Sequence, residues 1–226
     1  MKWYMRKKPT NLRYGPKTTS VFNSRLIWNP ITQRHIQNNK RNRESIIKQV
    51  LKHRQNRLVL ISCSKTKAFK GQESLKAKDA YCSPLFNKSK EWAEGKGLNW
   101  AVISARHGVV WPNQEIEDYD LTVSELSKEQ KKKWAEKVSS QLYVWSLDSS
   151  VENAEEEPQV IALAGKAYTE PLKKGLKSFF KEGGREITVK EPLEGLQVGE
   201  RLSKLTKENE LNYSALYKAT GVKRNV

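Results

Sequence analysis

Short apolar runs that alternate with helical segments are the feature that most constrains the fold of this chain. Leu58–Ile61, Trp100–Ile103 and Gln159–Ala164 have the length and the β-branched content of buried strands. A helix is predicted over 84–94, between the first two runs, with Ser83 as a natural N-cap. A strand, a helix and a second strand in this order favour a parallel pair joined by a right-handed crossover.

The alternation continues toward the C-terminus, with helices predicted over 127–147, 170–181 and 198–208 and a strand over 187–189. The core candidates of the first of these helices are Trp134, Val138, Leu142, Val144 and Trp145. The predicted fold class is α/β: a three-layer Rossmann-like sandwich with a mostly parallel central sheet and a basic N-terminal extension. The predicted division is an arm over 1–56 that ends in an amphipathic helix, a core domain over 57–208, and a short helix with a basic tail over 209–226.

Polar side chains follow three of the predicted strands, in the segments Ser62–Lys67, Ser104–Gly108 and Gly165–Tyr168. Because the carboxyl ends of parallel strands share one edge of a sheet, we expect these groups to line one pocket for an anionic, hydrogen-bonding ligand such as a nucleotide. The candidate catalytic residues are His107, Asp120 and Lys166. The candidate substrate-binding residues are Ser62, Cys63, Lys65, Lys67, Tyr81, Ser83, Ser104, Arg106, Gly108, Tyr119, Tyr168 and Glu194.

Several of these residues have an equally good structural explanation. A lone histidine such as His107 is as often a turn-stabilising donor as a reactive group, and Asp120 could cap the helix that follows it. A cysteine beside a strand end, as Cys63 is, is more often a small buried residue than a nucleophile. The lysines after the first strand resemble an anion-binding loop in composition, but the GxxxxGK[ST] pattern of a phosphate-binding loop is absent.

The positive charge of the chain is concentrated in its first quarter. Residues 1–56 hold fourteen Lys or Arg and one acid, Glu44, a net charge of +13 out of +17 for the chain. Such an arm suits a polyanion, and its interleaved aromatic residues suit stacking on bases, so nucleic acid is the predicted partner. A solvated basic tail is the alternative. The candidate nucleic-acid-binding residues are Arg6, Lys7, Lys8, Arg13, Arg41, Arg43, Lys48 and Lys52.

The two cysteines, Cys63 and Cys82, cannot form a disulfide framework, which fits a reducing cytoplasmic setting. The N-terminus has charge but no apolar core typical of a signal peptide, and no stretch approaches eighteen apolar residues, so no membrane association is expected. No cluster of Cys and His with metal-ligand spacing occurs, and we expect neither a metal nor a cofactor. The oligomeric state is left open.

From about Arg57 to Leu205 the chain resembles a bacterial and phage domain family of unknown function, in six pieces that recur in order: LVLISCSKTK, AYCSPLF, WAVISARHGVV, IEDYDLT, ALAGKAY and PLEGLQVGERL. The block ISARHGVVWP…YDLT is also similar, more distantly, to the YaaA-type peroxide-stress proteins, which are associated with DNA binding. This resemblance implies chemistry on nucleic acids or nucleobases. It does not cover residues 1–56.

The function expected first is an enzyme that acts on a base or an N-glycosidic bond in DNA. Asp120 would polarise a water or stabilise an oxocarbenium-like centre, and His107 or Lys166 would stabilise the departing base. In this scheme Lys65 and Lys67 hold a flanking phosphate, and Tyr81 or Tyr168 stacks on an extruded base. The alternatives are a non-catalytic DNA- or RNA-binding protein and a nucleotide-processing enzyme with an incidental basic arm.

Overall fold

The structure is a computed structural model that describes residues 56–147, 157–180 and 186–220. The predictions made for residues 1–55, including the helix from about Arg43 and the candidate nucleic-acid-binding residues, lie outside the described residues. No helix in the described segments is long and apolar enough to cross a membrane.

A five-stranded sheet forms the centre of the fold, with the strand order β4-β3-β1-β6-β7. Its strands β1 (Arg57–Ser62), β3 (Asn99–Ser104), β6 (Gln159–Leu163) and β7 (Thr188–Lys190) run parallel to their neighbours. Among the described strands of this sheet, only β4 (Gly108–Val110) is antiparallel to its neighbour, and it pairs with β3 at one edge. The predicted mostly parallel sheet is therefore confirmed.

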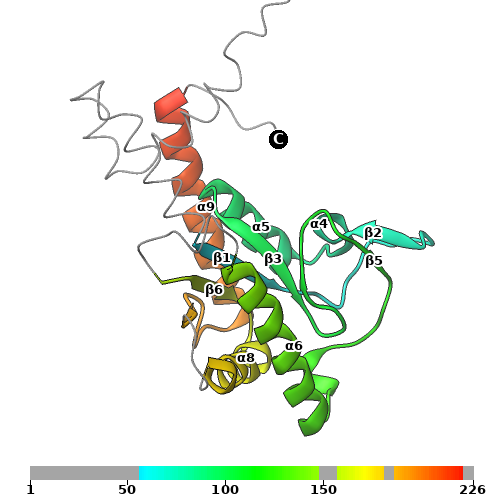
Figure 1. Cartoon of the computed structure of the whole chain (residues 1–226). Coiled ribbons are helices and arrows are strands. Elements are labelled where there is room, and N and C mark those ends of the chain that lie inside the picture. Colours follow the sequence, from blue (N-terminus) through cyan, green and yellow to red (C-terminus); the bar gives the residue numbers. More distant parts are fainter. Residues whose placement is uncertain (1–55, 148–156, 181–185, 221–226) are drawn as a thin grey trace, which may run out of the picture.

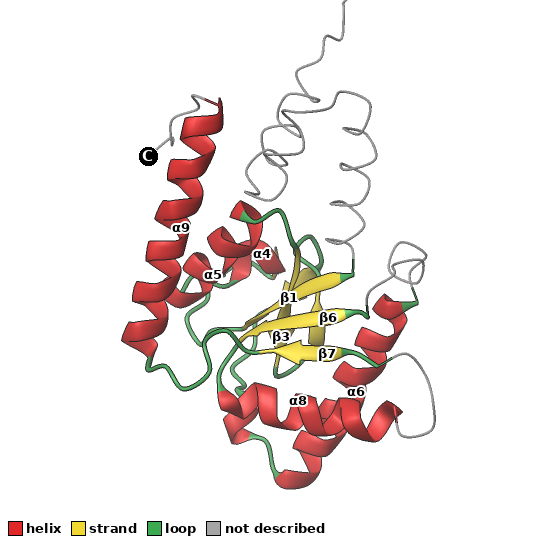
Figure 2. Ribbon diagram, turned by 90° about the vertical axis from the view of Figure 1, so that its left-hand side faces the viewer, coloured by secondary structure: helices red, strands yellow, loops and turns green. Residues whose placement is uncertain are grey.

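Helices cover both faces of this sheet, as Figure 2 shows. The helices α5 (Pro84–Gly95) and α9 (Val198–Thr220) lie on one face, and α6 (Lys128–Ser146) and α8 (Lys166–Phe179) lie on the other. The sheet has a hydrophobic core on each face, because successive side chains of a strand such as β1 point to opposite faces. Leu58 and Leu60 pack with α6 and α8, whereas Val59 and Ile61 pack with α5. The predicted three-layer α/β/α architecture is confirmed.

A smaller two-stranded ribbon extends from the main body, as Figure 1 shows. It pairs β2 (Ser74–Lys76) with β5 (Glu115–Glu117) in antiparallel register, and it continues into the short helix α4 (Ala77–Ala80). A 3-10 turn, η1 (Val123–Glu125), precedes α6. These elements have three or four residues each, which is too short for hydrophobic periodicity to reveal them in the sequence.

The structure differs from the sequence prediction at three places in the helices. Helix α8 begins at Lys166, four residues earlier than predicted, so Pro171 lies inside the helix rather than near its start. One continuous helix, α9, occupies the region where a helix over 198–208 and a separate short helix were predicted. Val144 is 65% exposed although it was predicted in the core, because the side chains of α6 that face the sheet are Trp134, Val138, Leu142 and Trp145.

Candidate functional site

Parallel register brings the turns after β1, β3 and β6 to one edge of the sheet. Ser62 pairs with Ile103 of β3, and Ile61 pairs with Leu163 of β6, so the three strands end at nearly the same level. The backbone N–H of Cys63 continues the ladder by donating to the carbonyl of Ile103 at 3.1 Å. The predicted convergence of these strand ends is present in the structure.

A cavity of about 390 Å³ lies at the end of β1, between its following turn and the first turn of α5. Ser83 caps α5 by accepting a hydrogen bond from the N–H of Phe86 at 3.2 Å, so its predicted role as an N-cap is confirmed. The lining combines hydroxyl and thiol groups with apolar side chains: Ile61, Ser62, Cys63, Ser64, Ser83, Pro84, Leu85, Phe86, Ser89, Val198 and Leu202. We call this cavity the β1 pocket.

Cys63 connects the β1 pocket to the start of α8. Its Sγ lies 3.1 Å from the hydroxyl oxygen of Tyr168, within hydrogen-bonding distance. The ring of Tyr168 meets that of Trp134 edge to face, with ring centroids 5.9 Å apart. Burial, reinforced by the neighbouring Cys63, raises the pKa of Tyr168 above its ordinary value, so its hydroxyl is neutral at physiological pH.

Two further tyrosines form a buried chain of hydrogen bonds beside this contact. The hydroxyl of Tyr119 lies 2.8 Å from the hydroxyl of Tyr81 and 2.7 Å from Oγ of Ser104. Burial raises the pKa of Tyr81 to about 12, and burial also raises the pKa of Tyr119. Both rings are buried, so they cannot stack on an extruded base without a change in structure.

Ser104 also organises the turn that carries His107. Its Oγ accepts hydrogen bonds from the backbone N–H groups of Arg106 at 3.2 Å and of His107 at 3.1 Å. The carbonyl of Ser104 accepts a hydrogen bond from Nε1 of Trp134 at 2.8 Å. Ser104 is therefore tied to the backbone and to Tyr119.

The imidazole of His107 packs edge to face on the ring of Tyr119, with centroids 5.2 Å apart. Its Nε2 is buried and has no hydrogen-bond partner among the described residues. Burial lowers the pKa of His107, and the nearby charges of Arg106 and Lys137 lower it further. The ring is therefore a neutral group, suited to accepting or donating one hydrogen bond rather than to pairing with an anion.

Lys67 stabilises the loop that carries Tyr119. Its Nζ donates to the carbonyl oxygen of Tyr119, lies 4.4 Å from the centroid of the Tyr119 ring, and lies 3.8 Å from a carboxylate oxygen of Asp118. The Lys67 side chain is only 8% exposed. The ammonium group of Lys67 is therefore buried and engaged within the protein. It is not placed to bind a phosphate of the substrate, which is the role that the sequence suggested for it.

The remaining candidates do not line the β1 pocket. Gly108 has a φ of +76°, and a Cβ there would lie 2.2 Å from Oε1 of Gln141, so the glycine is required by the turn. The oxygen of that Gln141 amide accepts from the N–H of Val109 at 2.8 Å, and its nitrogen donates to the carbonyl of Val109 at 3.1 Å. Five other predicted site residues have exposed side chains: Lys65, Arg106, Asp120, Lys166 and Glu194.

Sequence reasoning did not identify much of the apolar lining. Leu85 and Phe86 enter the pocket from the first turn of α5, while Val198 and Leu202 enter from the start of α9, more than 110 residues later. Phe86 and Leu85 sit beside the recognised cap Ser83, which is a usable signal. Nothing local in the sequence places Val198 next to Cys63. No group of three or more His, Cys, Asp and Glu side chains that could hold a metal occurs among the described residues.

The fold and the site together define a doubly wound α/β protein with a ligand-sized cavity at the carboxyl edge of its parallel sheet. The chain belongs to a family of unknown function, DUF6884, whose sequence profile matches residues 58–207. The predicted membership of a family of unknown function is thereby confirmed. The chain is also similar to the uncharacterised protein YfjM of Bacillus subtilis (strain 168), with 33% identity over 70 residues. That alignment covers 29% of this chain and 47% of YfjM, so the chain spans about half the length of this relative.

Proposed function

We propose that this chain is a nucleic-acid-binding protein that accommodates a nucleobase in the β1 pocket and acts on the base or on its N-glycosidic bond. The highly basic segment 1–56 supports the nucleic-acid part of this proposal, because a net charge of +13 is a strong electrostatic attractant for phosphates. The resemblance of the ISARHGVVWP…YDLT block to YaaA-type proteins supports the same partner.

The lining of the β1 pocket is the observation that carries the nucleobase part. Its polar side chains are the hydroxyls of Ser62, Ser64, Ser83 and Ser89 and the thiol of Cys63, and its other lining side chains are apolar. A nucleobase has two apolar faces and a hydrogen-bonding edge, which is the complement of such a lining. The first turn of α5 adds the positive end of a helix dipole, which favours a carbonyl oxygen of the base.

Two side chains are candidates for supporting a reaction. Cys63 lines the cavity and offers a sulfur nucleophile, and Asp120, which does not line the cavity, is an exposed carboxylate that follows the buried Tyr119 in the chain. In hydrolysis of an N-glycosidic bond, water adds to C1′ of the sugar while the C1′–N bond breaks, and its electron pair leaves with the base. Asp120 would accept the proton from the water, and the departing base would take up a proton from solvent.

A non-catalytic binding protein is the second candidate. In the described part of the chain, the side chains that line the β1 pocket include no carboxylate, imidazole or amine. General acid–base chemistry inside this cavity would therefore need a group brought in by the ligand or by a movement of the 118–120 loop. This composition favours recognition of a base without turnover.

Mass spectrometry of bases released from duplex and single-stranded oligonucleotides with modified bases distinguishes the two candidates. The wild-type chain is compared with Asp120→Asn, Cys63→Ala and the matched control Glu115→Gln, an exposed acid on β5. Loss of release in the first or second variant, with oligonucleotide affinity retained and the control unaffected, supports the enzyme. Tight binding without release supports the binding protein, and absence of any oligonucleotide binding contradicts both.

A further inference from the structure

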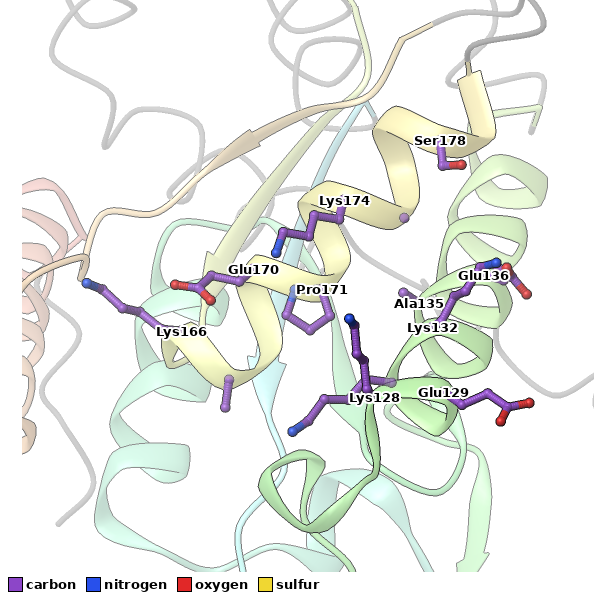
Figure 3. Close-up of a pocket in the computed structure, with 13 residues that line it drawn as sticks. Lys128, Glu129, Lys132, Ala135, Glu136, Lys166, Glu170, Pro171, Lys174 and Ser178 are labelled. Carbon is purple, nitrogen blue, oxygen red and sulfur yellow. The ribbon is translucent and has the colours of Figure 1, made fainter.

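A second and larger cavity lies on the opposite face of the sheet from the β1 pocket, between α6 and α8. It has a volume of about 770 Å³, and Figure 3 shows its lining. The residues around it are Lys128, Glu129, Lys131, Lys132, Ala135, Glu136, Lys166, Ala167, Glu170, Pro171, Lys174, Gly175 and Ser178. We call this cavity the α6–α8 groove.

Small residues on the facing helices form the floor of the groove. A Cβ on Gly175 of α8 would lie 2.9 Å from both Cβ and the carbonyl oxygen of Ala135 on α6. The two helices therefore approach closely at this point, and Ala167 and Pro171 extend the apolar floor along α8. Most of the surface inside the groove is apolar, while long charged side chains stand around it.

The charges around the groove are arranged asymmetrically. Helices α6 and α8 carry nine lysines and three glutamates. In Figure 3 Lys128 extends from α6 into the space between the helices, whereas Glu129 and Glu136 point away from it. Lys174 runs along α8, with its amine on the same side as Glu170. The described salt bridges of these helices use Lys133, with Glu129, and Lys173, with Glu191, so none of the five lysines that line the groove is ion-paired in the described part of the chain.

We propose that the α6–α8 groove binds the sugar–phosphate backbone of a nucleic-acid strand. A ligand for this surface must present repeated negative charge to the unpaired lysines and apolar surface to the floor, as phosphates and sugars do. Among the described residues no aromatic side chain lines the groove, so it suits tracking of a backbone and not stacking of bases. Its end at Lys166, the first residue of α8, lies at the same sheet edge as the β1 pocket.

This inference rests on the nucleic-acid part of the proposed function and is independent of any reaction on a base. It places a contact surface for phosphates on the folded core, in addition to the basic segment at the N-terminus. A strand held in the groove would be led toward the carboxyl edge of the sheet, where Tyr168 contacts Cys63.

The first test is fluorescence anisotropy of a labelled oligothymidylate with the full-length chain over a range of salt concentrations. A triple variant, Lys128→Gln, Lys132→Gln and Lys174→Gln, is compared with a control of equal charge change at exposed lysines outside the groove: Lys76→Gln, Lys190→Gln and Lys207→Gln. Loss of three phosphate contacts is expected to reduce the slope of log affinity against log salt by about 2 and to weaken binding several-fold at moderate salt. The control is expected to change the slope by less than half of that amount.

Lysine acetylation read by mass spectrometry supplies the second test. Bound oligothymidylate is expected to protect Lys128 and Lys174 from acetylation and to leave Lys76 reactive. The groove proposal would be overturned if the wild-type chain binds the oligonucleotide, the two triple variants weaken binding equally, and the groove lysines are not protected. In that case nucleic-acid binding itself would still stand. No binding by the wild-type chain would overturn both, and equal protection by polyglutamate would assign the groove to acidic peptides instead.

Discussion

The sulfur of Cys63 lies 3.1 Å from the hydroxyl oxygen of Tyr168, although the two residues are 105 positions apart in the chain. This contact joins the turn after β1 to the first turn of α8 at the carboxyl edge of the sheet. It also places a half-buried thiol at the wall of the β1 pocket, in contrast to Cys82, which is exposed. The reactivity of Cys63 therefore depends on access to the pocket, whereas that of Cys82 depends on access at the surface.

Alkylation of the two thiols should reveal occupancy of the β1 pocket. Iodoacetamide is expected to modify Cys82 several-fold faster than Cys63, because access limits the reaction of the thiol in the pocket. An oligonucleotide that presents its base to the pocket should slow modification of Cys63 and leave that of Cys82 unchanged. Peptide mass spectrometry over a time course measures both rates. Equal slowing at both thiols, or at neither, would contradict base binding in this pocket.

Lys67 is predicted to contribute to stability, whereas its neighbour Lys65 is not. Replacement of Lys67 by methionine removes the hydrogen bond to the Tyr119 carbonyl and the contact with the Tyr119 ring, at a cost of about 1 to 3 kcal/mol in the free energy of unfolding. Lys65 is exposed, so Lys65→Met should change that free energy by less than about 0.5 kcal/mol. Urea unfolding followed by circular dichroism measures both. Similar values for the two variants would show that the loop does not depend on Lys67.

Gly108 and Gly71 form a matched pair for separating backbone strain from steric overlap. Both have positive φ, +76° and +85°, so an alanine at either position costs about 1 kcal/mol in backbone conformation. Only at Gly108 would the new Cβ meet another atom, Oε1 of Gln141 at 2.2 Å, whereas nothing lies within 4 Å of a Cβ at Gly71. We expect Gly108→Ala to cost about 2 to 4 kcal/mol and Gly71→Ala about 1 kcal/mol.

Substitution of Gln141 tests whether the overlap with its side chain accounts for the extra cost at Gly108. Combining Gly108→Ala with Gln141→Ala should cost less than the sum of the two single changes, because the overlap is then removed. Thermal and urea unfolding of the four proteins complete the cycle. If the two free-energy changes were strictly additive, the alanine at position 108 would not be in steric conflict with the Gln141 side chain.

The buried tyrosines predict a loss of stability at high pH. Burial raises the pKa of Tyr81 from 10.0 to about 12, so the folded state keeps the phenol protonated where the unfolded state releases its proton. The stabilisation is complete below pH 10 and is lost as the pH rises from 10 through 12. For Tyr81 alone this loss amounts to about 2 to 3 kcal/mol. Urea unfolding between pH 9 and pH 11.5 should show a shallower decline in Tyr81→Phe than in the wild type, and equal slopes would contradict the assigned burial effect.

Much of the fold was predictable because it depends on local pattern. The apolar runs at 58–61, 100–103 and 159–164 predicted the three central strands to within one or two residues, and Ser83 marked the start of α5. Their order predicted parallel pairing, and parallel pairing predicted that their carboxyl ends would meet. The start of α8 was placed four residues late, since Pro171 is a typical first-turn residue and here lies inside the helix.

The sequence by itself determined the parallel α/β class, the edge at which the polar turns gather and the charge of the N-terminal segment, because each follows from periodicity, connection order or composition. Only the tertiary structure decided which polar groups face a cavity. It committed Lys67 to Tyr119, joined Tyr81, Tyr119 and Ser104 in a buried chain, and left Asp120 and Lys166 at the surface. The physical reason is that burial and hydrogen-bond partners depend on contacts between residues distant in sequence, such as Cys63 with Tyr168, which no local pattern encodes.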